Sequence, residues 1–210
     1  MLVAFDFDGV VTRPDSMSVL IRAALRRRPW RVALLVRPGL QYTRARTVEG
    51  KAAASRRCSL AAFGGLRLSM LTALAEGVAA RLVEPRQLHE DGLALLRAHV
   101  AKGHEVVVVT ATYERLAEQI LARLDLPTVK VLGTTFEDDG TGLRMAHHNY
   151  GEGKSHKWLA TQQFPPNRLY TDSWTDIPLA KLADVTTLIH ASRATTRAFA
   201  EADLAFDTAG

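Results

Sequence analysis

The chain has 210 residues, of which 47% are hydrophobic and 23% charged, so it can bury a core and does not have the composition of a disordered protein. Its apolar runs, such as residues 32–36 and 106–109, are far shorter than the roughly 20 residues of a membrane-spanning helix. A single cysteine, Cys58, excludes an internal disulfide, and no signal-peptide pattern opens the sequence, so we expect an intracellular, cytoplasmic protein.

The net charge of +5 is unevenly distributed along the chain. Residues 13–67 hold 13 Lys/Arg and 2 Asp/Glu, a net charge of +11, and the remainder carries −6. Such a basic segment raises the local potential and could attract phospholipid head groups, nucleic acid or an anionic substrate. A solvated arginine-rich surface explains the same composition.

The first predicted element is a buried parallel strand over residues 2–7, which ends at Gly9. A second strand of the same kind is predicted over residues 105–109. It follows a helix over about residues 85–101, which closes with a basic residue and Gly103.

Downstream, helical and extended patterns alternate. The predicted elements are a helix over 114–124, a strand over 129–132, a hairpin over 134–145, a helix over 154–163, and strands over 168–170 and 185–189. Strands alternating with helices predict an α/β fold, a doubly wound parallel sheet with helices on both faces.

Almost a hundred residues separate the first two strands, many more than a crossover connection needs. They are rich in Ala, Leu and Arg and have no clear strand pattern. We therefore expect residues 16–84 to form a helical insertion over the C-terminal edge of the sheet, broken at Gly64 and Gly65.

Two carboxylates, Asp6 and Asp8, stand where the first strand ends. Gly9 lets the chain turn, so that the Asp8 side chain and carbonyl can point in separate directions. A pair of capping aspartates in a loop is the simpler alternative.

Further polar residues follow later strands or begin a helix. Thr110 follows the second strand, Lys154 begins a helix after Gly153, and Asp172 and Asp176 follow the strand at 168–170. In an open parallel sheet these ends converge on one crevice.

With these four motifs in this order, the chain resembles the haloacid dehalogenase (HAD) superfamily of phosphatases and phosphotransferases. The resemblance implies a HAD-like Rossmannoid core. It also implies the following roles: Asp6 as nucleophile, Asp8 as general acid/base, Thr110 as phosphate-binding hydroxyl, Lys154 as charge clamp, and Asp172 with Asp176 as the acidic metal motif.

The chemistry fits those residue types. A carboxylate that attacks phosphorus needs a divalent cation to offset the repulsion between two anions, and Mg²⁺ suits carboxylate oxygens. By resemblance, the metal ligands are Asp6, the Asp8 carbonyl and Asp172, with Asp176 in support. The same resemblance implies a phosphatase and not a true dehalogenase, because within the superfamily the phosphatases carry an acid at the position of Asp8 and the true dehalogenases lack it.

Two alternatives remain open at these positions. Asp176 could instead cap the helix that begins near Pro178. Lys157 could replace Lys154 as the clamp, although the preceding Gly153 and the helix start favour Lys154.

By resemblance, residues 1–15 and 85–210 form the catalytic core. Residues 16–84 resemble the helical cap of the branch that includes phosphoserine phosphatase and phosphatidylglycerophosphatase C. Within this cap, residues 24–38 place arginines around an apolar run with Trp30 at its edge, a pattern typical of a helix lying in a lipid head-group layer. An ordinary buried cap helix with exposed flanking arginines remains the alternative.

We therefore expect a Mg²⁺-dependent phosphomonoester hydrolase whose substrate is a lipid phosphate, such as phosphatidylglycerophosphate, or a small soluble phosphate ester. Peripheral contact with the inner face of the membrane would accompany a lipid substrate. The alternative is a non-catalytic HAD-fold module that binds anionic lipid or nucleic acid through its basic cap. No nucleic-acid fold signature supports the latter partner, and the sequence does not define the oligomeric state.

Overall fold

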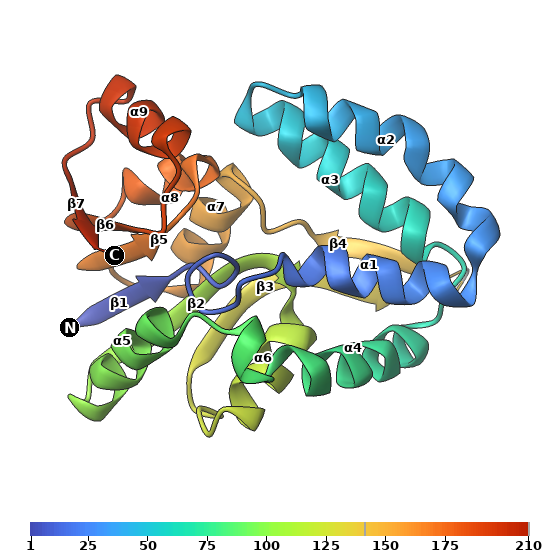
Figure 1. Cartoon of the computed structure of the whole chain (residues 1–210), viewed down its shortest axis with the longest axis horizontal. Coiled ribbons are helices and arrows are strands. Elements are labelled where there is room, and N and C mark those ends of the chain that lie inside the picture. Colours follow the sequence, from blue (N-terminus) through green and yellow to red (C-terminus); the bar gives the residue numbers. More distant parts are fainter. Residues whose placement is uncertain (141, 210) are drawn as a thin grey trace.

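A sheet of seven strands runs through the part of the chain that the computed structural model describes, residues 1–140 and 142–209 (Figure 1). The strands are β1 (Leu2–Phe5), β2 (Glu105–Tyr113), β3 (Lys130–Asp138), β4 (Leu143–His147), β5 (Arg168–Thr171), β6 (Val185–Ile189) and β7 (Phe206–Ala209). Their order is β4-β3-β2-β1-β5-β6-β7. All neighbours pair in parallel except β3 and β4, which form an antiparallel hairpin. The prediction of a doubly wound α/β fold is confirmed.

Helices cover both faces of this sheet. The α-helices are α1 (Ser16–Arg27), α2 (Val32–Arg44), α3 (Val48–Phe63), α4 (Leu68–Leu82), α5 (Glu90–Ala101), α6 (Glu114–Arg123), α7 (Glu152–Thr161), α8 (Ile177–Ala180) and α9 (Arg193–Glu201). Short 3₁₀ helices are η1 (Pro29–Arg31), η2 (Pro85–Gln87) and η3 (Trp174–Asp176).

Alternate residues of the central strands supply two separate cores. Val3 and Phe5 of β1 face the cluster that contains apolar residues of α4, α5 and α6, whereas Ala4 faces the cluster that contains Trp158 of α7 and Phe199 of α9. Burial on both faces explains why the strand sequences are continuous apolar runs.

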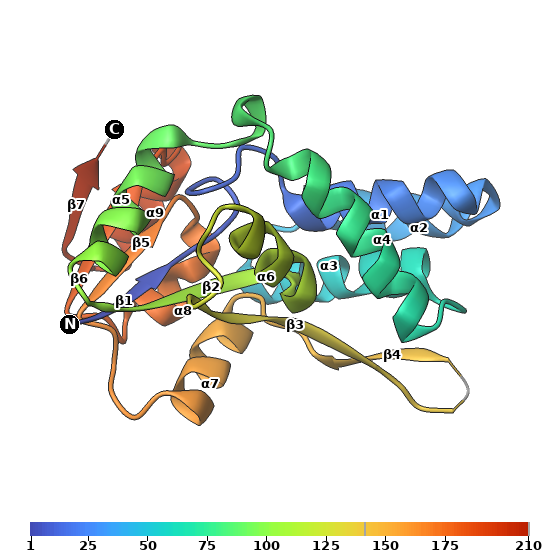
Figure 2. The same ribbon diagram turned by 90° about the horizontal axis from the view of Figure 1, so that it is seen from below.

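Helices α1 to α4 occupy residues 16–82, between β1 and β2, as we expected of the insertion. Helix α2 packs on α3, and α1 packs on α3 and α4. The hairpin β3–β4 extends away from the sheet and contacts α3 and α4 (Figure 2). The helices of residues 16–82 therefore contact the sheet through α1, α3 and α4.

Most element boundaries moved by a few residues. Strand β1 ends at Phe5 and not at residue 7, while β2 and β3 continue to Tyr113 and Asp138, beyond the apolar runs that predicted them. The expected hairpin over 134–145 is present as β3–β4, although its Thr141, like Gly210, lies outside the described residues. Helix α9 and strand β7 were not predicted.

The segment 24–38 is not one helix. Helix α1 ends at Arg27, and Pro29 begins η1, because proline has no N–H to continue the helix. Two arginines of this segment are structural. Arg28 donates to the carbonyls of Gly64 and Gly65 at 2.7 and 2.6 Å, and Arg31 donates to Ala61 O at 2.7 Å, which satisfies carbonyls at the end of α3.

Helix α2 contradicts the alternative of a buried cap helix, because none of its residues is buried. Leu34 is 54% exposed, Val36 66% and Leu40 47%, and Trp30 just before the helix is 70% exposed. Among the described residues no single helix is long and apolar enough to cross a membrane; α3 and α4 pass that test only as a pair, bent by 103°.

The order of the strands places the end of β1 at a switch point. The chain leaves β1 with β2 on one side and β5 on the other. Loops following β1, β2 and β5 therefore meet at one edge of the sheet, the usual position of a ligand crevice in such folds.

Candidate active site

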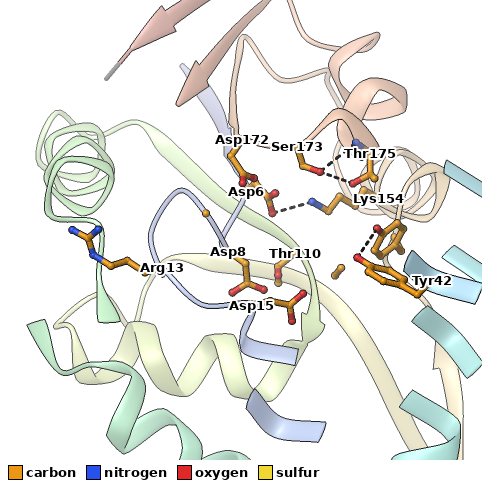
Figure 3. Close-up of a pocket in the computed structure, with 13 residues that line it drawn as sticks. Asp6, Asp8, Arg13, Asp15, Tyr42, Thr110, Lys154, Asp172, Ser173 and Thr175 are labelled. Carbon is orange, nitrogen blue, oxygen red and sulfur yellow. Dashed lines mark hydrogen bonds and ion pairs between the residues drawn. The ribbon is translucent and has the colours of Figure 1, made fainter. Parts of the chain in front are cut away.

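A cleft of about 250 Å³ lies at this edge (Figure 3). Its lining residues are Asp6, Asp8, Gly9, Arg13, Asp15, Tyr42, Thr110, Ala111, Tyr150, Lys154, Asp172, Ser173 and Thr175. Five of the six site residues predicted from sequence line it. The sixth, Asp176, is fully buried and contacts the cleft through Lys154.

A buried lysine joins two of the predicted carboxylates. Lys154, on the first turn of α7, donates from Nζ to Asp6 Oδ1 at 2.9 Å and to Asp176 Oδ2 at 2.9 Å. Burial alone would lower the pKa of Lys154, but the charges of Asp176 and Asp6 more than compensate and raise it. Lys154 therefore remains a fixed positive charge beside Asp6.

Asp176 does not cap a helix. It precedes α8, but its side chain makes no capping hydrogen bond; instead it accepts from Thr171 Oγ1 at 2.8 Å and from Lys154. The capping alternative for this residue is wrong. Its carboxylate and that of Asp6 both accept from Lys154 Nζ and so hold the lysine in place.

Lys157 does not reach the cleft. Its Nζ lies 2.6 Å from Glu114 Oε2 and 2.7 Å from the carbonyl of Gly133. The carboxylate of Glu114 also accepts from the N–H of Gly133, which fastens the start of α6 to β3. The structure therefore assigns the lysine beside Asp6 to position 154.

Asp8 is held at the junction between sheet and insertion. Its Oδ1 accepts from Thr12 Oγ1 at 2.7 Å, and its Oδ2 lies 3.0 Å from the hydroxyl of Ser16, the first residue of α1. Burial and the nearby charge of Asp15 raise the pKa of Asp8 to about 7. A carboxylic acid with this pKa can both donate and accept a proton near neutrality.

Gly9 allows the loop after β1 to pass directly beneath Asp172. Its φ of +84° is in the left-handed region, and a Cβ at this position would overlap the Asp172 carboxylate. The glycine is therefore required both for the turn and for the approach of the loop after β5.

Thr110 is fully buried in β2, and its Oγ1 accepts from the N–H of Thr112 at 3.1 Å. Sequence reasoning missed the residue that holds this strand end. Buried Asn149 donates from Nδ2 to Thr110 O at 2.9 Å and to Leu132 O at 2.7 Å, and so joins β2 and β3 to the loop before α7. Its position shortly before the Gly151–Lys154 motif is the only sequence signal for this role.

The far wall of the cleft is formed by Tyr42 of the insertion together with Tyr150 and Asp15 of the core, and the two tyrosines were not predicted. The hydroxyls of Tyr42 in α2 and Tyr150 before α7 lie 3.3 Å apart, and Lys51 Nζ sits 4.6 Å from the centre of the Tyr42 ring. Asp15 caps α1 by accepting from the N–H of Ser18 at 2.6 Å and also faces the cleft (Figure 3). These side chains surround the space beyond Asp6 and Asp8.

The carboxylates of the cleft repel one another. Burial and then the charge of Asp176 raise the pKa of Asp6 well above its ordinary value, and the same causes raise the pKa of Asp172 to about 6. One lysine faces three carboxylates, so the cluster carries excess negative charge. Hard oxygen donors with unbalanced charge are the environment that Mg²⁺ prefers, and the residues present fit this ion.

Comparison with known sequences identifies one family. The family profile of haloacid dehalogenase-like hydrolases matches residues 3–181. Phosphoserine phosphatase SerB1 of Mycobacterium tuberculosis is 31% identical over 146 residues, which make up 66% of this chain and 46% of that protein. The chain thus spans less than half the length of the curated relatives it matches.

Solved structures share the fold at lower identity. A protein of unknown function from Bordetella pertussis superposes with a TM-score of 0.70 at 19% identity and covers 98% of this chain and 97% of that one. A phospho-aspartyl intermediate analogue of phosphoserine phosphatase superposes with a TM-score of 0.58 at 15% identity, covering 94% and 90%. The whole chain, insertion included, therefore has structural counterparts.

Proposed function

Because the chain belongs to the haloacid dehalogenase-like hydrolase family, we propose that it is a Mg²⁺-dependent phosphomonoester hydrolase that works through a phosphorylated Asp6. The observation that carries this proposal is the shared cleft of Asp6, Asp8, Thr110, Lys154 and Asp172. The phosphoserine phosphatases among its relatives give the same reaction class.

In the first half of the reaction, a carboxylate oxygen of Asp6 attacks phosphorus, and the bond from phosphorus to the leaving oxygen breaks. Asp8 gives its proton to that oxygen, so the product leaves as an alcohol. Lys154 and the Thr110 hydroxyl bind the phosphoryl oxygens and stabilise their charge.

In the second half, Asp8 takes a proton from water, which attacks phosphorus and releases inorganic phosphate and the Asp6 carboxylate. The same group thus donates and then accepts one proton. Its pKa of about 7 suits both steps.

Mg²⁺ would be held by Asp6, the carbonyl of Asp8 and Asp172, with Asp176 in support through Lys154. When bound, it supplies positive charge that offsets the repulsion between the Asp6 carboxylate and the phosphoryl group. We propose that the core formed by 1–15 and 85–210 performs this chemistry, and that the cap formed by 16–84 selects the substrate.

For the substrate, we propose a phosphate ester whose leaving group lies between Asp15, Tyr42 and Tyr150. Two classes remain. The exposed apolar side chains of α2 and its exposed Arg37 and Arg44 favour a lipid phosphate, such as phosphatidylglycerophosphate, reached by peripheral contact with an anionic membrane surface. Asp15 favours a small soluble ester with an amino group, since its carboxylate can pair with an ammonium group.

Hydrolysis of p-nitrophenyl phosphate with and without Mg²⁺ tests the reaction class. We expect turnover that requires the metal and is lost in Asp6→Asn, which keeps the size of the side chain. No turnover by the folded chain, on this substrate and on a broad panel of phosphomonoesters, would favour the non-catalytic binding module.

The panel that separates the substrate classes contains phosphatidylglycerophosphate, phosphoserine and sugar phosphates, together with flotation of the protein on anionic and neutral vesicles. A lipid substrate predicts binding to anionic vesicles and preference for the lipid ester. Lack of vesicle binding at low salt, with preference for phosphoserine, would assign the soluble class.

A further inference from the structure

Outside the cleft, a second cluster of ligating side chains lies where α5 approaches β6. His89 immediately precedes α5, Asp91 is in its first turn, and His190 immediately follows β6. One ligand atom from each lies within 4.8 Å of the others. Two imidazoles and one carboxylate, about a hundred residues apart in the chain, therefore lie close together.

The contacts within this cluster are close. His190 Nε2 lies 2.9 Å from Asp91 Oδ2, and the rings of His89 and His190 are stacked with centroids 4.1 Å apart at an interplanar angle of 19°. Ligand atoms on a tetrahedral zinc ion, at about 2.1 Å from the metal, are about 3.4 Å apart. Because the two rings are stacked nearly parallel, both imidazoles must turn before their ring nitrogens point at one ion.

The backbone under the cluster is firmly placed. The N–H of His89 donates to Val11 O at 2.9 Å, and Gly92 packs so tightly on Val10 O that a Cβ would overlap it. On the other side, His190 directly follows β6, which pairs with β5 and β7, and its own φ of 52° is in the left-handed region. The ligands therefore project from rigid elements and not from a long loop.

One side of the cluster is open to solvent. The exposed side of the cluster leaves room for water as a further ligand, since Asp91 is 56% exposed and His190 28% exposed in their side chains.

We propose that His89, Asp91 and His190 bind a second metal ion of the zinc class and thereby link the start of α5 to the end of β6. Two nitrogen donors and one oxygen favour Zn²⁺ or a similar late transition ion over Mg²⁺, whose preferred ligands are oxygens. The site is separate from the cleft: none of the three residues lines it.

Titration of the full chain with Zn²⁺ by calorimetry, in excess Mg²⁺, tests the proposal. We expect one tight equivalent and a rise in Tm, both lost in His190→Ala and in His89→Ala, with affinity at least about tenfold weaker in Asp91→Asn. His156→Ala, which removes an exposed imidazole elsewhere on the surface, is the matched control and should keep the site.

Co²⁺ gives a second readout that does not depend on activity, because its visible absorption reports the ligand geometry. The expected spectrum appears in wild type and in Asp172→Asn and is absent in His190→Ala. Retention of the tight Zn²⁺ equivalent in folded His89→Ala and His190→Ala would overturn the proposal and leave an ordinary His190–Asp91 ion pair.

Discussion

The loops at the C-terminal edge of the sheet and helix α2 are opposite in construction. At the sheet edge, Asp6 and Asp176 are buried and both accept from buried Lys154, and buried Thr110 accepts from Asn149. Helix α2 has no buried residue and exposes large apolar side chains to solvent. Under the proposed function, the first region would carry out the chemistry and the second would contact the substrate or a membrane surface.

The two lysines of α7 give the largest expected difference. Lys154→Ala leaves Asp6 and Asp176 buried without their cation, so we expect it to destabilise the fold by about 3–5 kcal/mol and to lower kcat at least about a hundredfold. Lys157→Ala removes a partly exposed ion pair with Glu114 and should cost about 1 kcal/mol, with kcat nearly unchanged. Denaturant unfolding and steady-state kinetics measure both; equal loss of activity in the two variants would contradict the assignment.

Two glycines offer a matched test of the two regions. Gly9→Ala strains a backbone at φ +84° and displaces Asp172, so we expect a cost of about 1–3 kcal/mol and loss of most activity. Gly39→Ala in α2 meets no atom within 4 Å and should stabilise the helix by about 0.5–1 kcal/mol. Thermal unfolding and turnover of both variants measure the difference. If Gly9→Ala kept near wild-type turnover, activity would not depend on the position of Asp172 described here.

The raised pKa of Asp8 predicts a dependence of rate on pH. Because the proton donor must be protonated, kcat/KM for an alkyl phosphate should fall as pH rises through about 7. An ester with a good leaving group needs the donor less and should show a weaker decline. Parallel pH–rate profiles for both esters would argue against Asp8 as the acid.

The same shift predicts a dependence of stability on pH. The pKa of Asp8 is about 7 in the folded chain and 3.8 is its ordinary value, so the folded state binds more protons between them. Its contribution to the free energy of unfolding is complete at low pH and is lost as pH rises toward 7. In the metal-free protein, the free energy of unfolding should decline less with rising pH in Asp8→Asn than in the wild type. Identical dependence on pH in the two proteins would contradict the raised pKa of Asp8.

The smallest effect on turnover is expected in α2. Leu34→Glu with Val36→Glu alters only exposed side chains, so hydrolysis of p-nitrophenyl phosphate and Tm should stay close to wild type. Flotation on anionic vesicles should be lost if this face contacts lipid. Unchanged vesicle binding would place the membrane contact elsewhere.

The sequence predicted elements best where local pattern and burial agree. The strand over 185–189 was predicted because a short apolar run is typical of a buried strand. The helix break at Gly64 was predicted because glycine commonly ends a helix. The break at Pro29 was missed because the arginines and apolar residues around it were read as one amphipathic segment. Strand β7 was missed because its exposed residues show no buried pattern.

Within the site, motif order predicted which residues would meet, since strand order brings the ends of β1, β2 and β5 together. It could not predict the supporting contacts. Asn149 bridges Thr110 and Leu132, and Tyr42 meets Tyr150 across 108 positions; both depend on the packing of separate elements and leave no local pattern. The cluster of His89, Asp91 and His190 was invisible for the same reason.

Trapping the covalent intermediate tests the central claim most directly. The protein is mixed with a radiolabelled phosphomonoester and Mg²⁺, quenched in acid and then treated with hydroxylamine, which cleaves acyl phosphates. We predict label that survives acid, is released by hydroxylamine and is absent from Asp6→Asn. Hydrolysis that proceeds without labelled protein, or label that persists in Asp6→Asn, would contradict the account.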